Sequence, residues 1–190
     1  MPSDGYANLL IGAQGDGPAL SASTSPTSLL PGQAKYIMPA GFIDVIGKKF
    51  RLTAQGRIST VVTTPGTLTL SLRWNATPII VSTSQAFALN VVAKTNTTWW
   101  LELLITARAV GSGTSANLMV NGVWESEAVI GSPLQSAGGI GALPWQASAP
   151  AVGTGFDSTV ANLIDFYGTW SVNSGSNSIQ VHDYALESLN

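Results

Sequence analysis

Cysteine is absent from the 190-residue chain, and this absence excludes disulfides and thiolate metal sites. Small secreted domains are often stapled by disulfides, so a stable fold here has to come from an apolar core. Residues 1–5 lack the basic and apolar segments of a secretory signal, and we expect none. Apolar runs such as 99–105 are too short to span a bilayer. The sequence therefore predicts a protein made in a cytoplasm, with no membrane partner.

Charge is also scarce. Charged residues make up 9% of the chain, whereas a typical soluble domain carries about 25%. Eight Lys and Arg against ten Asp and Glu give a formal charge of −2, which offers no electrostatic attraction for nucleic acid or an anionic membrane. Apolar residues reach 45%. We therefore expect a surface covered by Ser, Thr and Asn and, in part, by contacts with other subunits.

A helical period of 3.6 residues is missing as well, and alternation with a period of two replaces it. In residues 67–74 the apolar Leu68, Leu70, Leu72 and Trp74 alternate with polar neighbours, as in a half-buried strand. Similar segments are separated by Gly, Pro, Asn and Ser. We predict an all-β fold, a jelly-roll-type β-sandwich of about eight to nine antiparallel strands. The segments are 50–54, 67–74, 87–91, 99–110, 117–124, 160–172 and 178–186.

The segment 99–110 has apolar residues on both of its faces. One face has Trp99 and every second residue to Ile105, whereas the other has Trp100, Glu102 and Leu104. This pattern predicts a central strand, covered on both sides for part of its length. Consecutive side chains of a strand point to opposite faces, so one of the two tryptophans should face the core and the other away from it.

Two regions lack a strand pattern. Residues 1–34 are rich in Gly, Ser, Ala and Pro, and we interpret them as an irregular N-terminal arm that attaches to a partner, with 35–190 as the sandwich domain. Residues 125–157 are interpreted as a long surface connection with a short extra hairpin. Two sites in these regions are candidate partner contacts. They are the apolar patch Leu9, Leu10 and Ile11 in the arm, and Trp145 as an exposed anchor in the long loop, since a loop tryptophan does not easily reach the core.

Reactive groups do not gather in the sequence. His182 is the only histidine, and its neighbour Asp183 would point to the opposite face of a strand, so the two do not form a catalytic dyad. Glu125 and Glu127 share one strand face and are the only carboxylate pair that suggests a glycosidase. Asp157 and Asp165 are isolated. We predict a protein that is not an enzyme and that holds no catalytic residue, metal or cofactor.

Several segments resemble one family. They are 28–31, 36–42, 47–59 and 64–70, together with 179–190 at the end of the chain. In their pattern of strands and turns they are similar to small virion proteins of tailed bacteriophages. The resemblance implies a jelly-roll subunit of the capsid or tail, often trimeric, with an N-terminal arm that attaches it. It implies a virion location after assembly in the cytoplasm of a host bacterium.

Three functions remain open from the sequence. The first is a trimeric capsid decoration (cement) subunit that binds the major capsid protein or other virion proteins, with a tail or fibre location as its main variant. The second is a carbohydrate-binding module for host adhesion, whose glycan would stack on Trp145 and Trp124. The third is a hydrolase that uses Glu125 and Glu127.

Overall fold

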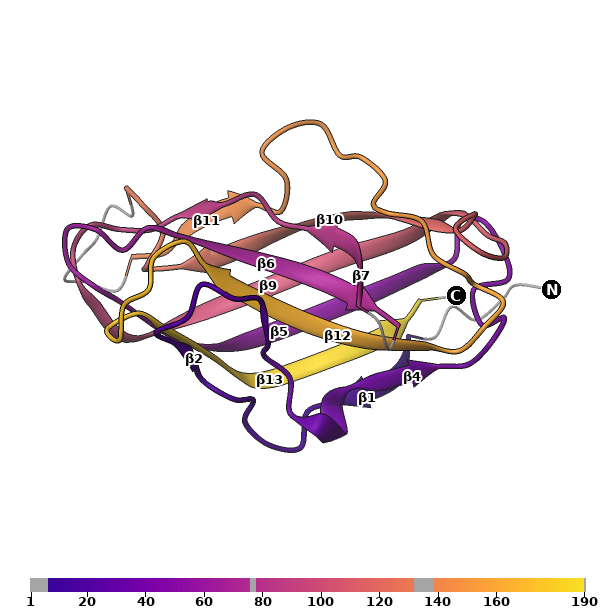
Figure 1. The fold of residues 1–190 in the computed structure, drawn as a ribbon, viewed down its shortest axis with the longest axis horizontal. Helices are drawn as coiled ribbons and strands as arrows, with labels where there is room; N and C mark the ends of the chain where they lie inside the picture. The colour runs from indigo at the N-terminus through magenta and orange to yellow at the C-terminus, as the bar shows by residue number, and fades with distance from the viewer. Residues whose placement is uncertain (1–6, 76–77, 132–138, 190) are drawn as a thin grey trace.

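A computed structural model describes residues 7–75, 78–131 and 139–189 of the chain. In these residues two antiparallel sheets pack face to face, with β6 and β12 of one sheet in front of β5, β9 and β13 of the other (Figure 1). The predicted all-β sandwich is therefore confirmed. The only helical element in these ranges is the short 3₁₀ turn η1 (Gly32–Ala34). No helix in the described part of the chain has the length and hydropathy needed to cross a membrane.

The larger sheet has seven strands and carries the site described below. Its strand order is β1, β13, β5, β9, β10 and β11, and β2 pairs with β13 beside this path. The bounds are β1 (Asn8–Gly12), β2 (Leu20–Ser21), β5 (Lys49–Thr60), β9 (Lys94–Ala109), β10 (Asn117–Ser126), β11 (Gly141–Pro144) and β13 (Ser178–Ser188).

The smaller sheet has six strands. Its order is β3, β12, β6 and β7, with β4 paired to β12 and β8 paired to β6. The bounds are β3 (Thr27–Ser28), β4 (Tyr36–Met38), β6 (Thr67–Trp74), β7 (Ile79–Thr83), β8 (Phe87–Ala88) and β12 (Asn162–Trp170). The chain crosses between sheets from β5 to β6 and again from β12 to β13, and β12 lies beside β6 while β13 lies beside β5. These two connections between the sheets run in opposite directions, and they are the jelly-roll-type feature of the chain's path through the sandwich.

Large aromatic side chains fill the space between the sheets. Five of the six tryptophans are buried, and Phe87 stacks on Trp124 with ring centroids 4.9 Å apart. Aromatic side chains bury more apolar area than other residues, so this packing supplies much of the stabilisation in a chain with little charge. The buried tryptophans are Trp74, Trp99, Trp124, Trp145 and Trp170.

The outer face of β9 differs from the prediction. The strand is central, between β5 and β10, but its burial alternates along most of its length, and Leu104 is 41% exposed. The outward-facing Trp100, Glu102 and Leu104 are all exposed, so among the described residues no segment covers the face at these positions. The prediction of cover on both sides was wrong, and the exposed apolar residues of this strand lie on an open surface.

The described part of residues 1–34 lies along this chain's own sheets. β1 and β2 pair with β13, β3 pairs with β12, and Leu20, Leu29 and Leu30 are buried in the core. Leu29 and Leu30 are consecutive and Leu20 lies nine positions before them, so the three leucines produce no period of two in the sequence. Attachment of this segment to another protein stays a prediction.

Trp145 is not the exposed anchor expected from the sequence, and that prediction was wrong. Its side chain is fully buried, and its indole Nε1 donates a hydrogen bond to the Ser82 hydroxyl at 2.9 Å. The preceding strand β11 pairs with β10, and the Trp145 amide donates to the Gly122 carbonyl at 2.8 Å. This pairing directs the ring between the sheets. Trp124 is also fully buried, so neither tryptophan can stack on a sugar.

Replacing Trp145 with alanine should therefore destabilise the fold by about 3–5 kcal/mol, because a large buried ring is lost and a cavity remains. Trp100→Ala is the matched control, since Trp100 is partly exposed and its loss leaves no cavity. Urea unfolding followed by circular dichroism measures both free energies of unfolding. Equal unfolding midpoints for the two variants would contradict the placement of Trp145 in the core.

Candidate functional site

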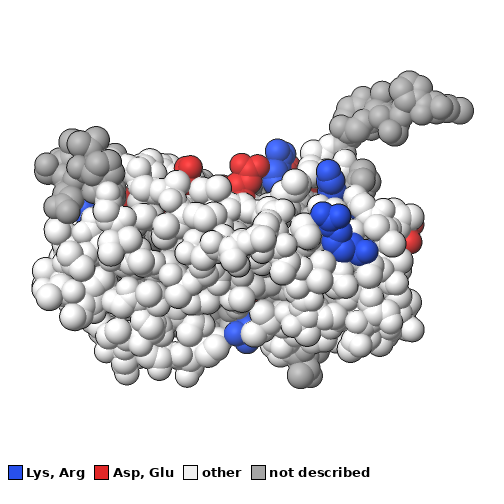
Figure 2. Space-filling view, turned by 90° about the horizontal axis from the view of Figure 1, so that it is seen from above, with Lys and Arg blue, Asp and Glu red and all other residues white. Residues whose placement is uncertain are grey.

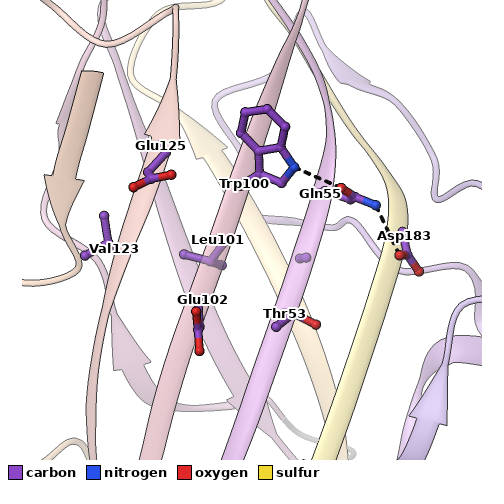
Figure 3. A pocket seen from close by; sticks show the side chains of 9 residues that line it. Thr53, Gln55, Trp100, Leu101, Glu102, Val123, Glu125 and Asp183 are labelled. Carbon is purple, nitrogen blue, oxygen red and sulfur yellow. Dashed lines mark hydrogen bonds between the residues drawn. The ribbon is translucent and has the colours of Figure 1, made fainter. Parts of the chain in front are cut away.

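A hollow lies on the outer face of the seven-stranded sheet, over β13, β5, β9 and β10 (Figure 3). Its volume is about 490 Å³, within the range of small-molecule binding sites. It has an aromatic ring, an amide and three carboxylates among its lining groups. The lining residues are Thr53, Ala54, Gln55, Trp100, Leu101, Glu102, Val123, Glu125 and Asp183.

Strand register aligns four of these residues in one row across the sheet. Glu125 of β10 is opposite Trp100 of β9, Trp100 is opposite Gln55 of β5, and Gln55 is opposite Asp183 of β13. Directly opposed residues of antiparallel strands have Cβ atoms roughly 4.5–5.5 Å apart. Figure 3 shows the resulting order, with Trp100 between Glu125 and Gln55. Four strands that are distant in sequence thus build one continuous surface.

Trp100 is held in place by hydrogen bonds. Its indole Nε1 donates to Gln55 Oε1 at 2.9 Å, and Gln55 Nε2 donates to Asp183 Oδ2 at 3.2 Å (Figure 3). The preceding Trp99 is fully buried and its Nε1 donates to the Arg57 carbonyl at 3.2 Å, which fixes the strand from the other side. Trp100 is 38% exposed. It therefore presents an oriented aromatic surface to solvent.

A bulge in β13 brings Asp183 into the row. The register of β13 on β5 shifts between Val181, which pairs with Gly56, and Asp183, which pairs with Gln55. A Cβ atom on Gly56 would lie 1.9 Å from the Gln180 carbonyl oxygen, so only glycine allows this close approach of the two backbones. As a result Val181 faces the core while Asp183 faces the hollow.

The hollow is acidic. Glu102, Glu125 and Asp183 line it, and no Lys or Arg is among its lining residues. On the same face Arg51 is paired with Glu187 at 2.7 Å, and Arg57 donates to Gln180 Oε1 at 2.8 Å. The face of the molecule seen in Figure 2 is formed mainly by uncharged residues. The hollow is thus suited to neutral or cationic ligands and unsuited to anions.

The carboxylates singled out from the sequence do not form a catalytic pair. Glu125 lines the hollow, but Glu127 lies beyond the end of β10 and pairs with Lys94 at 2.6 Å. The predicted pairing of Glu125 and Glu127 on one face was therefore wrong. His182 Nδ1 lies 2.8 Å from Asp16 Oδ1, so the histidine ties the N-terminal segment to β13.

The other two acidic residues that were considered have structural roles. Asp165 accepts a hydrogen bond from the Ser28 hydroxyl at 2.7 Å and pairs with Lys35 at 2.7 Å. Hydrogen bonds from the Thr159 hydroxyl, from the Gly113 amide and from the Thr159 amide lower the pKa of Asp157. Asp157 thereby joins the loops after β9 and before β12.

The proposed partner contacts in β1 have mixed exposure. Leu9 is 58% exposed, whereas Leu10 and Ile11 pack partly against the core. Only Leu9 presents most of its side chain to a partner. Within residues 7–75, 78–131 and 139–189, no three His, Asp or Glu side chains are grouped closely enough to hold a metal ion.

The hollow was not predicted from the sequence, although some of its residues stood out there. Trp100 and Glu102 were seen on one face of their strand, but that face was expected to be partly covered. Gln55 and Asp183 gave no signal, because their contact spans 128 positions. A charged Glu102 between Trp100 and Leu104 was the available sign that the face is open.

No family model matches the chain, and no curated protein matches it. One solved structure with some likeness is the CBM2 module of the evolved Dit of Lactobacillus casei BL23 phage J-1. It is 9% identical with a TM-score of 0.37, and the likeness covers 97% of each chain. We draw no conclusion from a likeness of this degree.

Gly56→Ala should disrupt the site, because the added Cβ meets the Gln180 carbonyl. We expect a loss of about 1–3 kcal/mol in unfolding free energy from overpacking, together with a changed tryptophan fluorescence of the folded protein as the contact between Gln55 and Asp183 breaks. Gly175→Ala is the matched control, since its Cβ would meet nothing within 4 Å. Unaltered stability and fluorescence in Gly56→Ala would contradict the role of the bulge.

Asp157→Asn should change the acid dependence of stability. A folded-state pKa below the ordinary value of 3.8 means that the carboxylate stabilises the fold above that pH and stops doing so as the pH falls through the lowered pKa. The variant should melt at a lower temperature than the wild type at neutral pH, with the gap closing in acid. Melting curves recorded from neutral to strongly acidic pH measure this gap. A gap that is constant with pH would refute the role of Asp157.

Proposed function

We propose that the chain is a non-enzymatic carbohydrate-binding protein of a bacteriophage virion, with the hollow over β5, β9, β10 and β13 as its binding site. The observation that carries this proposal is Trp100. It is the one tryptophan of six that is exposed, and its ring is oriented by Gln55 and Asp183. A polar group that fixes an aromatic ring in solvent is characteristic of a surface prepared for stacking.

The residues around Trp100 suit a sugar. A pyranose ring has an apolar face of C–H groups, which can stack on an indole, and a rim of hydroxyls, which donate and accept hydrogen bonds. The carboxylates of Glu102, Glu125 and Asp183 accept such bonds, and the Gln55 amide can do both. All of these side chains are on long strands of one sheet, so the site is preformed and loses little entropy on binding.

The arrangement supports binding without hydrolysis. A glycosidase places one carboxylic acid and one carboxylate on opposite sides of the bond that it cleaves. Here Glu102 and Glu125 are diagonal neighbours on adjacent strands of the same sheet face, so both would contact the same side of a bound sugar. His182, the remaining candidate from the sequence, has its Nδ1 2.8 Å from Asp16 Oδ1. These positions are the basis for proposing that the chain is not an enzyme and needs no cofactor.

The virion setting rests on the resemblance to small virion proteins of tailed bacteriophages. A sugar-binding face is useful to a virion where it meets the host surface, and this favours a tail or fibre location over capsid decoration. A homotrimer and contacts with the major capsid protein or other virion proteins remain part of the proposal. Such contacts would involve the exposed apolar residues of the loops and edges, such as Ile37, Ile46 and Val62.

Carbohydrate binding can be tested with Trp100→Ala. A glycan array followed by isothermal titration of the strongest hit should give binding by the wild type. Because a central aromatic contact of an interface is typically worth 2 kcal/mol or more, the variant should bind at least about 30-fold more weakly. Leu104→Ala is the matched control, since Leu104 is exposed on the same strand but does not line the hollow, and it should bind like the wild type.

Two results would contradict the proposal. Unchanged affinity in Trp100→Ala, or a blank glycan array, would remove the hollow as a sugar site. Appearance of shortened products, when the bound oligosaccharide is incubated with the protein and analysed by mass spectrometry, would show that the protein is an enzyme.

A further inference from the structure

The acidic residues of the chain differ in whether they contact a basic side chain. Nine of them lie in the described ranges, and five of these contact a basic side chain. Asp157 instead accepts backbone and hydroxyl hydrogen bonds. The three that have no basic partner in these ranges are Glu102, Glu125 and Asp183, and all three line the hollow. The five paired residues are Asp16, Asp44, Glu127, Asp165 and Glu187.

Two of these carboxylates lie next to the aromatic ring. Glu125 is directly opposite Trp100, and Glu102 is the next outward residue of β9. Glu102 and Glu125 are therefore diagonal neighbours, whose Cβ atoms are about 7–8 Å apart or slightly less. Two like charges at this spacing repel each other, and a cation between them would be attracted to both. The face of an indole also attracts cations.

A ligand that fits the two carboxylates and the indole has a ring that stacks on the indole and a positively charged group attached to that ring. We propose that the preferred sugar carries a free amino group, as in a de-N-acetylated hexosamine, and that Glu102 and Glu125 hold its ammonium while Trp100 stacks on its ring. This inference rests on the proposed carbohydrate function and names the class of sugar. Asp183 is engaged by Gln55 and acts as a positioning residue for Trp100.

The same geometry disfavours other glycans. Uronic acids and phosphate-bearing polymers would place an anion against three carboxylates, with no Lys or Arg in the lining to compensate. N-acetylated hexosamines lack the charge and leave Glu102 and Glu125 without a cation. The hollow therefore selects by charge as well as by shape.

Matched oligosaccharides separate these cases. The probes are a glucosamine hexasaccharide and an N-acetylglucosamine hexasaccharide, titrated calorimetrically into the full chain at mildly acidic pH, where the sugar amine is protonated. Hydrogen bonds between charged partners are about twice as strong as neutral ones, so the amino form should bind at least about 10-fold more tightly. The preference should fall as salt rises, because the carboxylates are exposed to solvent.

Variants of equal size test the carboxylates. Glu102→Gln combined with Glu125→Gln should abolish the preference between the two hexasaccharides while the N-acetylated one still binds. Asp44→Asn is a control for the loss of a negative charge outside the hollow, since Asp44 is exposed in the loop before β5, and it should keep the full preference. Circular dichroism confirms that the variants fold.

The outcomes distinguish this inference from the proposed function. Equal or tighter binding of the N-acetylated probe by the wild type would overturn the amino-sugar assignment and leave carbohydrate binding intact. Failure of both hexasaccharides, and of every glycan on the array, would remove both proposals. A lysine hexapeptide that binds as tightly as the amino sugar, with the same dependence on Glu102 and Glu125, would replace the sugar with a cationic peptide.

Discussion

The alternation of side chains along β9 is the constraint on which both the core and the candidate site depend. Trp99 and Trp100 are consecutive, so one indole packs between the sheets while the other faces solvent. The buried ring donates to the Arg57 carbonyl, and the exposed one donates to Gln55, both on β5. A shift of one residue in this register would place Trp99 in solvent and Glu102 in the core. Folding and recognition are therefore fixed by the same pairing.

Because the chain has few charged residues, the position and the partner of each one are informative. Most acidic groups are consumed in contacts that hold segments together, such as Asp165 with Lys35 and Ser28, or Asp16 with His182. Those contacts join parts of the chain that are distant in sequence, and several of them fasten the N-terminal segment to the two sheets. Three carboxylates that have no basic partner in the described ranges line one hollow, and they make the site acidic.

The sequence predicted the sandwich well because its strands alternate strictly, as in 67–74, and alternation reports burial on one face directly. The positions of individual side chains in the fold were harder to predict. Trp145 was expected at the surface because a tryptophan in a long loop does not easily reach the core, but pairing of β11 with β10 carries it inward. Local patterns held one sign of an open face, the charge of Glu102, but the row from Glu125 to Asp183 could not be predicted, since it exists only through pairing of four strands and a bulge in β13 opposite Gly56.

The central claim is that the Trp100 face of the seven-stranded sheet receives a sugar. A ¹⁵N-resolved NMR titration tests it most directly, because each of the six tryptophans gives one indole N–H signal. On addition of a bound oligosaccharide, the Trp100 indole and the Gln55 side-chain amide should shift in a saturable way, while the indole signals of Trp145 and Trp124 stay in place. Saturable shifts confined to residues outside this face, with Trp100 unchanged, would contradict the account.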